Sequence, residues 1–251
     1  MSLIALVLTT MTSCLHVRLG DRELMIGVDN TPTQVHEVGQ VTTMANFNEL
    51  DVVGPLNVIV QQGEAHTVNV KGTTQQLEKM TIYVKDGELT IRPRKSNSNS
   101  SDFDGLQVFV TSPTYKTLEL TGSGKITAPE ALTVDDLDLD LTGSGNITLA
   151  QLGCNKLSVD VSGSGEVTTG PIQANKVDTD VTGSGKINMT GLTCNNLEND
   201  LTGSGHMTFN NVNVKHVNSD VTGSGVIQLN GNVESHEEDV TGSGKFHLNE
   251  K

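Results

Sequence analysis

The chain has 251 residues, a formal net charge of −14 and only 3% aromatic side chains, with no Trp. This length allows one large domain or two small ones, but a compact core of that size would normally contain more aromatic rings. The strongly acidic charge repels phosphate backbones, so nucleic acid is excluded from the expected partners.

The first 14 residues have the pattern of a lipoprotein signal peptide. An apolar run at residues 3–8 is followed by Met11-Thr12-Ser13-Cys14, a lipobox whose Cys is acylated and becomes the mature N-terminus. No Lys or Arg precedes the apolar run, and the alternative is an uncleaved N-terminal segment. A transmembrane helix is not expected, because a membrane span needs about 20 apolar residues. Cys14 is therefore the predicted lipidation site, through which the protein would be anchored to a membrane.

Residues 15–45 have few periodic apolar positions and are predicted to form a tether. Residues 46–118 are predicted to be a β-rich part, because short runs of alternating apolar residues recur there. Asp86-Gly87 has the composition of a hairpin turn. A short helical turn is expected at residues 73–79 and a disordered loop at residues 95–105. We expect this part to begin the fold that follows or to cap it, since an uncovered sheet edge invites aggregation.

Residues 119–251 consist of a repeat with a period of about 20 residues. Each copy contains Gly-Ser-Gly, which begins at Gly122, Gly143, Gly163, Gly183, Gly203, Gly223 and Gly242. Apolar residues alternate on both sides of each copy, which indicates strands with one buried face rather than a flexible linker. Gly-Ser-Gly is the predicted turn, because glycine adopts backbone angles that Leu and Val resist. We therefore predict an all-β fold, a right-handed parallel β-helix or solenoid of about seven coils.

A second turn is predicted about halfway round each coil. Asn155, Asn175 and Asn195 share one position there and can hydrogen-bond to one another along the axis. Cys154 and Cys194 lie two coils apart, roughly 9.6 Å by strand spacing, which is too far for a disulfide. Both are predicted to be small buried side chains. A further column is predicted to hold His216 and His236, without a third ligand for a metal ion.

A column of carboxylates is the most unusual feature of the repeats. The residue three positions before each first Gly is acidic: Glu119, Asp140, Asp160, Asp180, Asp200, Asp220 and Asp239. Its neighbour points inward, so the column should point outward, with like charges about 4.8 Å apart. Two explanations remain open. Turn hydroxyls, backbone N–H groups and Lys125, Lys186 and Lys245 could offset the repulsion, or Ca²⁺, which prefers oxygen ligands, could bridge the aspartates.

The sequence contains no recognisable set of catalytic residues. A lyase of the pectate type needs a basic residue beside clustered carboxylates, but all four arginines lie outside the repeats: Arg18, Arg22, Arg92 and Arg94. The carboxylates recur uniformly, whereas a catalytic site would interrupt the repeat at one place. The serines of Gly-Ser-Gly lack the third Gly of a nucleophile elbow and recur in every coil. We therefore predict a protein that is not an enzyme and has no resident cofactor, apart from the Ca²⁺ considered above.

The chain resembles the bacterial family of the auto-transporter adhesin head domain, called the GIN domain. The resemblance covers residues 47–251 and includes residues 51–58 (DVVGPLNV), residues 85–91 (KDGELTI), Ser112-Pro113 and the Gly-Ser-Gly repeats. It implies a fold similar to the pectin-lyase superhelix, without the catalytic residues of the lyases. It also implies an exported protein or lipoprotein that acts in cell adhesion and assembles as a homotrimer.

These observations lead to one functional expectation and two alternatives. We expect an exported outer-membrane lipoprotein of the cell envelope that presents its acidic face to a surface protein or glycan, because a repeated surface suits many weak contacts. The first alternative is a periplasmic structural or regulatory binding module, and the second is a polysaccharide-active enzyme of pectin-lyase-like fold. The sequence leaves open whether the protein faces the outside or the periplasm.

Overall fold

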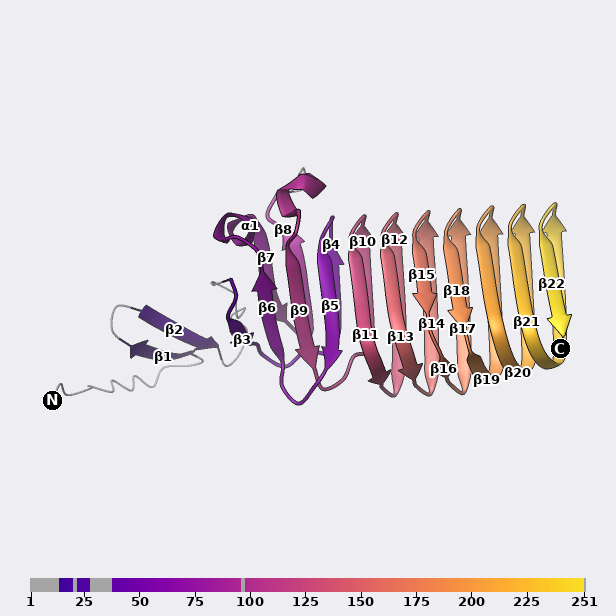
Figure 1. Cartoon of the computed structure of the whole chain (residues 1–251), viewed down its shortest axis with the longest axis horizontal. Helices are drawn as coiled ribbons and strands as arrows, with labels where there is room; N and C mark the ends of the chain where they lie inside the picture. The colour runs from indigo at the N-terminus through magenta and orange to yellow at the C-terminus, as the bar shows by residue number, and fades with distance from the viewer. Residues whose placement is uncertain (1–13, 20–21, 28–37, 96–97, 251) are drawn as a thin grey trace.

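A stack of β-coils makes up most of the molecule (Figure 1). The structure is a computed structural model and describes residues 14–19, 22–27, 38–95 and 98–250. Residues 1–13 of the expected signal peptide lie outside the described residues, and so does the side chain of Cys14. No helix in the described part of the chain is long and apolar enough to cross a membrane. The predicted all-β solenoid is confirmed.

Each coil of the repeat enters its Gly-Ser-Gly turn on one strand and leaves it on another. The entering strands are β10 (Thr117–Gly122), β12 (Asp136–Gly143), β14 (Lys156–Gly163) and β17 (Lys176–Gly183). The strands that follow the turns are β11 (Lys125–Thr133), β13 (Asn146–Gly153), β15 (Glu166–Thr169), β16 (Ile172–Gln173), β18 (Lys186–Thr190) and β22 (Lys245–Glu250). The longer strands that run around the second bend without a break are β19 (Leu192–Gly203), β20 (His206–Gly223) and β21 (Val226–Gly242). We call the outer surface of the strands that enter the turns the leading face, and that of the strands that leave them the trailing face.

Neighbouring coils pair in parallel and in register. Between β12 and β14, Leu137 lies beside Leu157 and Leu139 lies beside Val159. These side chains are buried, whereas the residues between them face outward. The core is therefore a set of apolar columns along the axis, as the alternation with period two predicts.

The first Gly of each Gly-Ser-Gly turn has a positive φ, between 115° and 124°. A Cβ atom on Gly183 would lie 2.7 Å from the carbonyl oxygen of Gly163 in the preceding coil. The same oxygen accepts a hydrogen bond of 2.8 Å from the backbone N–H of Ser184. Both the backbone angle and the close approach require glycine, and the structure confirms this motif as the turn.

Each coil has a third corner, which the sequence analysis did not predict. Gly191, Asn211 and Gly231, with φ angles of 81°, 56° and 148°, occupy this corner in successive coils. After the corner a short third side adds buried residues to the core, such as Leu132 beside Leu152. The coils therefore turn three times rather than twice.

Residues 46–118 belong to the same stack. The strands β4 (Glu49–Val53) and β5 (Asn57–Gln62) pair in parallel with β10 and β11 and form a further coil ahead of the repeats. The turn of this coil contains Gly54, whose N–H donates to the carbonyl oxygen of Thr121 over 2.7 Å. Next in the stack, β8 (Glu88–Pro93) and β9 (Gln107–Ser112) pair in parallel with β4 and β5. The β-rich part thus begins the solenoid.

Antiparallel strands close this end of the stack. β7 (Met80–Lys85) pairs with β8 through the predicted hairpin at Asp86-Gly87, whose φ angles are 52° and 87°. β6 (Thr67–Lys71) pairs with β9, and β3 (Val41–Thr43) pairs with β6. The helix α1 (Thr74–Glu78), capped by Thr73, confirms the expected helical turn. This end is therefore built differently from the repeats.

Two segments differ from their expected structure. The range 15–45, expected to be a tether, contains β3 and the antiparallel pair of β1 (Cys14–Leu19) and β2 (Arg22–Gly27). The range 95–105, expected to be a disordered loop, contains the 3-10 turn η1 (Ser100–Phe103). Phe103 is buried in the core, and the burial of this ring outweighs the polar composition around it.

Candidate functional site

An uninterrupted column of carboxylates runs along the leading face. The register places the seven predicted acids side by side, from Glu119 to Asp239. Asp51 of β4 lies beside Glu119 and adds an eighth member that the sequence analysis missed. We call these eight side chains the acidic column. A signal was present, because residues 50–54 (LDVVG) match residues 118–122 (LELTG), although Gly-Pro-Leu replaces Gly-Ser-Gly in that turn.

Burial and mutual repulsion act on the acidic column. The pKa is raised, by burial first and then by neighbouring carboxylates, at Asp140, Asp160 and Asp200. Burial and then the charge of Glu119 raise the pKa of Asp51 to about 6. These four aspartates therefore hold their protons more tightly than isolated aspartates do.

Lysines form ion pairs with two carboxylates of the next column on the leading face. The ammonium of Lys176 lies 3.0 Å from Asp178 and 2.8 Å from Glu198, and that of Lys156 lies 3.3 Å from Asp178. Among the described residues, no Lys, Arg or His lies within 4.0 Å of a carboxylate oxygen of the acidic column. The expected ion-pair contribution from Lys125, Lys186 and Lys245 is therefore not observed. The side chains of the acidic column are half-buried or exposed, and no ion pair with a described residue offsets their repulsion.

Hydroxyl groups flank the acidic column on the side of the turns. The row contains Thr121, Thr142, Ser162, Thr182, Thr202, Thr222 and Thr241. Thr182 donates a hydrogen bond of 3.3 Å to Asp180, so this part of the structural explanation is confirmed at one position. No three His, Cys, Asp or Glu side chains of the described residues come together in a way that could hold a metal ion. Bridging of the aspartates by Ca²⁺ stays a prediction.

The predicted asparagine ladder is confirmed for one pair. The amide of Asn195 donates to the amide oxygen of Asn175 over 2.6 Å, whereas Asn155 donates to Asp136 over 3.3 Å. A second ladder on the side of the trailing face was not predicted, with hydrogen bonds of 2.8 Å that link Asn210, Asn230 and Asn249. These ladders link neighbouring coils, and their amide groups hydrogen-bond to one another.

The two cysteines of the repeats are packed against the core. Cys194 is buried and Cys154 is half-buried. Burial raises the pKa of Cys154 to about 11 and that of Cys194 to about 12. Both thiols therefore stay protonated and unreactive at neutral pH.

The predicted histidine column is wrong. His216 lies beside Ser235, with 2.7 Å between Nδ1 and Oγ, whereas His236 lies beside Val217. The last repeat is 19 residues long instead of 20, and the missing residue falls at the third corner, between Asn210 and Val212. Counting forward from the turn therefore shifts the register by one residue, and the two rings do not share a column.

A Ser–His contact lies at the start of the solenoid. Ser112 Oγ is 3.2 Å from Nδ1 of His66. Ser112 is fully buried, and its hydroxyl is also within 3.0 Å of the carbonyl oxygen of Phe47 and 2.8 Å of that of Thr114. Burial lowers the pKa of His66, which keeps the ring neutral. The pair therefore fixes the backbone around it and is closed to a substrate.

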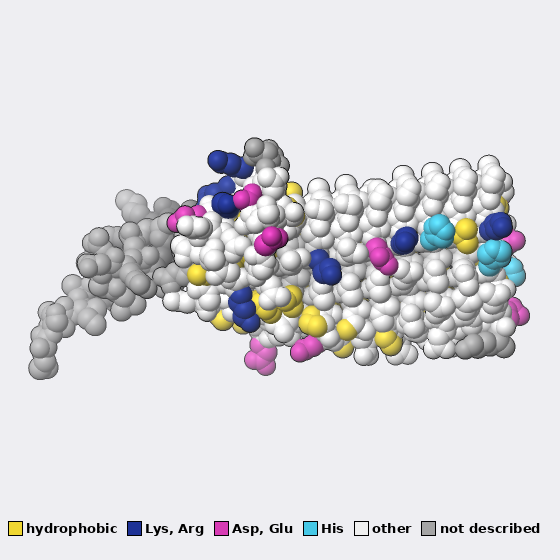
Figure 2. Space-filling view, turned by 45° about the horizontal axis from the view of Figure 1, so that its top comes forward, with side chains coloured by type: hydrophobic (Ala, Val, Ile, Leu, Met, Phe, Trp, Pro, Cys, Tyr) yellow, Lys and Arg dark blue, Asp and Glu magenta, His cyan; other side chains and the backbone are white. Residues whose placement is uncertain are grey.

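The trailing face has a different character from the leading face. Figure 2 shows it as largely uncharged, with a single row of mixed side chains along the repeats. The register of this row contains Lys125, Asn146, Glu166, Lys186, His206, Val226 and Lys245. The row contains three lysines and a single acid, Glu166, so no continuous column of carboxylates forms along this row.

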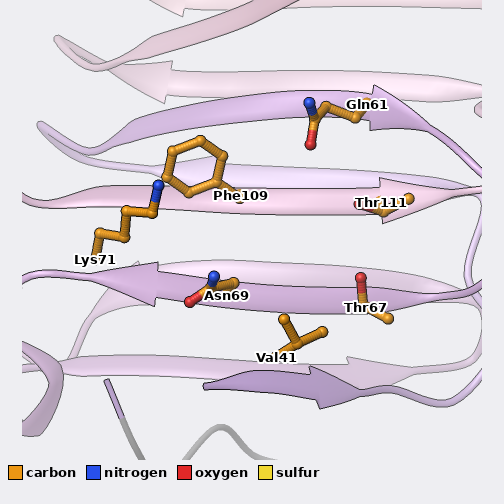
Figure 3. Close-up of a pocket in the computed structure, with 7 residues that line it drawn as sticks. All are labelled: Val41, Gln61, Thr67, Asn69, Lys71, Phe109 and Thr111. Atoms are coloured by element: carbon orange, nitrogen blue, oxygen red, sulfur yellow. The ribbon is translucent and has the colours of Figure 1, made fainter. Parts of the chain in front are cut away.

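A pocket of about 350 Å³ lies at the N-terminal end of the trailing face (Figure 3). The side chains that line it are Val41, Gln61, Thr67, Asn69, Lys71, Phe109 and Thr111. They come from β3, β5, β6 and β9, where the sheet changes from parallel to antiparallel pairing. The sequence analysis missed this site, because no local motif joins residues from four strands.

Comparison with protein families and solved structures gives consistent matches. The family model described as "Putative auto-transporter adhesin, head GIN domain" matches residues 46–213. No curated protein matches the chain. The crystal structure of a "putative adhesin" from Bacteroides fragilis is similar with a TM-score of 0.76 and 25% sequence identity, over 83% of this chain and 95% of that one.

Two further crystal structures share the fold. A "putative adhesin" from Parabacteroides distasonis has a TM-score of 0.65 and 22% identity, over 88% of this chain and 98% of that one. A "putative lipid binding protein" from the same species has a TM-score of 0.68 and 20% identity, over 88% and 97% of the two chains. The overall fold is therefore shared with several solved structures.

Proposed function

Because the chain belongs to the family of the auto-transporter adhesin head GIN domain, we propose that it is an exported, lipid-anchored adhesion module without catalytic activity. The surface that makes the contact is the leading face. Its partner is a surface protein or glycan that carries repeated positive or hydrogen-bonding groups.

The acidic column is the observation that carries this proposal. Eight carboxylates stand in register, and no described basic side chain lies within ion-pair distance of them. Like charges at the strand spacing of about 4.8 Å cost roughly 1 kcal/mol per pair even when fully solvated. Features that cost stability without a local compensation occur mainly at functional surfaces. A partner with complementary charge would relieve the repulsion on binding.

The repeat of the column suits contacts that are weak one by one. Eight acids span seven strand spacings, or roughly 34 Å. Each exposed charge contact contributes little, but several that form together raise the overall affinity steeply. The row of hydroxyl groups beside the column adds hydrogen-bond donors and acceptors along the same line.

The proposed anchor is an acyl group on Cys14, for which the support is the lipobox at residues 11–14. An anchor on this residue would leave residues 15–45 between the membrane and the solenoid, which begins within residues 46–118. The solenoid would then stand away from the membrane, with its leading face open to a partner.

The first experiment combines protease shaving of intact cells with an adhesion assay. Shaving should remove the protein from intact cells, and a Cys14→Ser variant should no longer sediment with membranes. For the assay, Asp140, Asp160, Asp180, Asp200 and Asp220 are replaced by Asn to give a neutral-column variant. Thr148→Ala, Thr168→Ala and Thr208→Ala on the trailing face give a matched control. Cells with the neutral column should adhere several-fold less well than cells with the control.

Protection of the protein until the cells are lysed would overturn the adhesion proposal. That outcome would favour the alternative of a periplasmic structural or regulatory module. Equal adhesion by the neutral-column and control cells would show that the leading face is not the contact surface. Circular dichroism of both purified variants should give the β-spectrum of the unmodified chain.

A further inference from the structure

The pocket on the trailing face holds an isolated positive charge. Lys71 lines it, and none of the other six lining residues is charged. Within the described residues, Lys71 forms no ion pair. An ammonium without a counter-charge, in a chain with a net charge of −14, is available to an anionic group of a ligand.

The ammonium of Lys71 is held at the wall of the pocket. It lies 4.2 Å from the centroid of the Phe109 ring, in a cation–π contact. Figure 3 shows the two side chains meeting at one end of the pocket, with Val41 on β3, the strand next to β6. Val41 is 65% exposed, and it is one of only two large hydrophobic side chains that the described residues leave exposed. The site therefore combines one cation with two apolar surfaces.

Uncharged polar groups occupy the space between the apolar surfaces. Asn69 lies between Phe109 and Val41 in the register of β9, β6 and β3. Its amide oxygen is buried and accepts no hydrogen bond from any described residue. A buried acceptor without a donor is unfavourable, so rotation of this amide to meet a ligand hydroxyl would be stabilising. Thr67, Thr111 and Gln61 add two hydroxyls and an amide at the other end.

We propose that this pocket binds an anionic sugar residue, which would be a second binding site beyond the acidic column. A pyranose ring has a face of C–H groups that packs against apolar side chains and a rim of hydroxyls for the amide and threonine groups. Its acidic substituent contacts the ammonium of Lys71. The substituent is a carboxylate in uronic acids or a sulfate in sulfated sugars, and the charge is what the two share. A peptide is the weaker candidate, because it would pair with the edge of β3 rather than fill a pocket rich in hydroxyls and amides.

Calorimetric titration of the full-length chain at low salt tests this proposal. The probes are a galacturonic acid disaccharide, a sulfated disaccharide and lactose as the neutral comparison. Lys71→Gln removes the charge from the pocket, and Lys116→Gln is the matched control, since Lys116 is exposed and lies outside the pocket. We expect saturable binding of at least one anionic sugar, with the stronger probe identifying the acidic group. Lys71→Gln should weaken this binding by about tenfold or more, as for a hydrogen bond to a charged group, and Lys116→Gln by less than about twofold.

Three results would overturn the proposal. They are the absence of saturable binding by both anionic sugars, equal binding of lactose, and equal weakening by Lys71→Gln and Lys116→Gln. Thermal melts of the two variants should match that of the unmodified chain, because both lysines are exposed. The titration uses purified protein and a site on the opposite face, so its failure would leave the adhesion proposal to the cell assay.

Discussion

At the scale of single residues, the glycines of the turns decide whether coils can stack. The first Gly of each turn has a positive φ, and its carbonyl oxygen accepts the N–H of the Ser in the following coil. The second Gly is constrained as well, since a Cβ on Gly185 would lie 2.5 Å from a methyl group of Val161. The serine between them is exposed and unconstrained. Steric constraints therefore require glycine at the first and third positions of the motif, whereas the middle position can accept other residues.

A single alanine at the first Gly of a turn tests the steric argument. Gly183→Ala should lower the free energy of unfolding by about 1–3 kcal/mol, through backbone strain and the contact with the Gly163 carbonyl oxygen. Ser184→Ala, one residue later, is the matched control and should change it by less than about 0.5 kcal/mol. Urea and thermal unfolding followed by circular dichroism measure both. Identical midpoints for the two variants would refute the steric argument.

At the scale of elements, one inward column changes from apolar to polar along the stack. In register it holds Leu118, Leu139, Val159, Thr179, Asn199, Ser219 and Glu238. Thr179 donates to Asn199 over 2.8 Å, and Asn199 donates to Ser219 over 2.8 Å. These three side chains are buried, so they satisfy one another inside the core. Glu238 in the last coil is exposed, and its charge at an inward position discourages further stacking.

Replacing one member of this hydrogen-bonded ladder should lower the stability of the protein more than replacing all three members by apolar residues. Asn199→Leu leaves the hydroxyl of Ser219 without its partner and should destabilise the protein by about 1–3 kcal/mol. A triple variant with Thr179→Val, Asn199→Leu and Ser219→Ala should recover much of this loss, because the same column is apolar at Leu139 and Val159. Asn218→Leu, exposed on the neighbouring position, controls for the change of residue type. A triple variant less stable than the single one would contradict this account.

At the scale of the whole molecule, the acidic column makes stability depend on pH. It runs from Asp51 in the first coil to Asp239 in the last, and the pKa of Asp51 is raised from 3.8 to about 6. A raised pKa means that the folded state binds the proton more tightly than the unfolded state. The stabilisation is complete below the unfolded value of 3.8 and is lost as the pH rises through about 6.

Thermal melts between about pH 5 and 7.5 test this linkage. The melting temperature should rise as the pH falls through this window. Asp51→Asn should raise it at pH 7.5 and flatten its dependence on pH, since Asn carries no charge beside Glu119. Asp86→Asn is the control, because Asp86 is exposed on the hairpin turn and is remote in register from the column. A profile for Asp51→Asn that runs parallel to that of the unmodified chain would show that the column does not couple to folding.

Features that repeat along the chain could be derived from the sequence alone. The period of Gly-Ser-Gly and the alternation around it determine the strands, the turn and which residues face outward, because equivalent residues about 20 apart must pair in register. The acidic column from Glu119 to Asp239 follows directly. The shift of His236 could not be derived from the sequence, because the last repeat is shortened at a corner that has no clear local pattern.

Features that join distant, non-repeating segments were decided only by the tertiary structure. The short match of residues 50–54 to residues 118–122 is too weak to place Asp51 by itself, and the burial of Leu50 and Val52 sets the register of β4 beside β10. The pocket exists because β6 and β3 pair antiparallel beside β9, which brings Lys71, Asn69 and Val41 next to Phe109. Pairing of this kind depends on which apolar faces can be buried together across the whole fold. A sequence repeat predicts contacts between equivalent segments. The contacts that form the pocket join segments that are not equivalent, so no repeat predicts them.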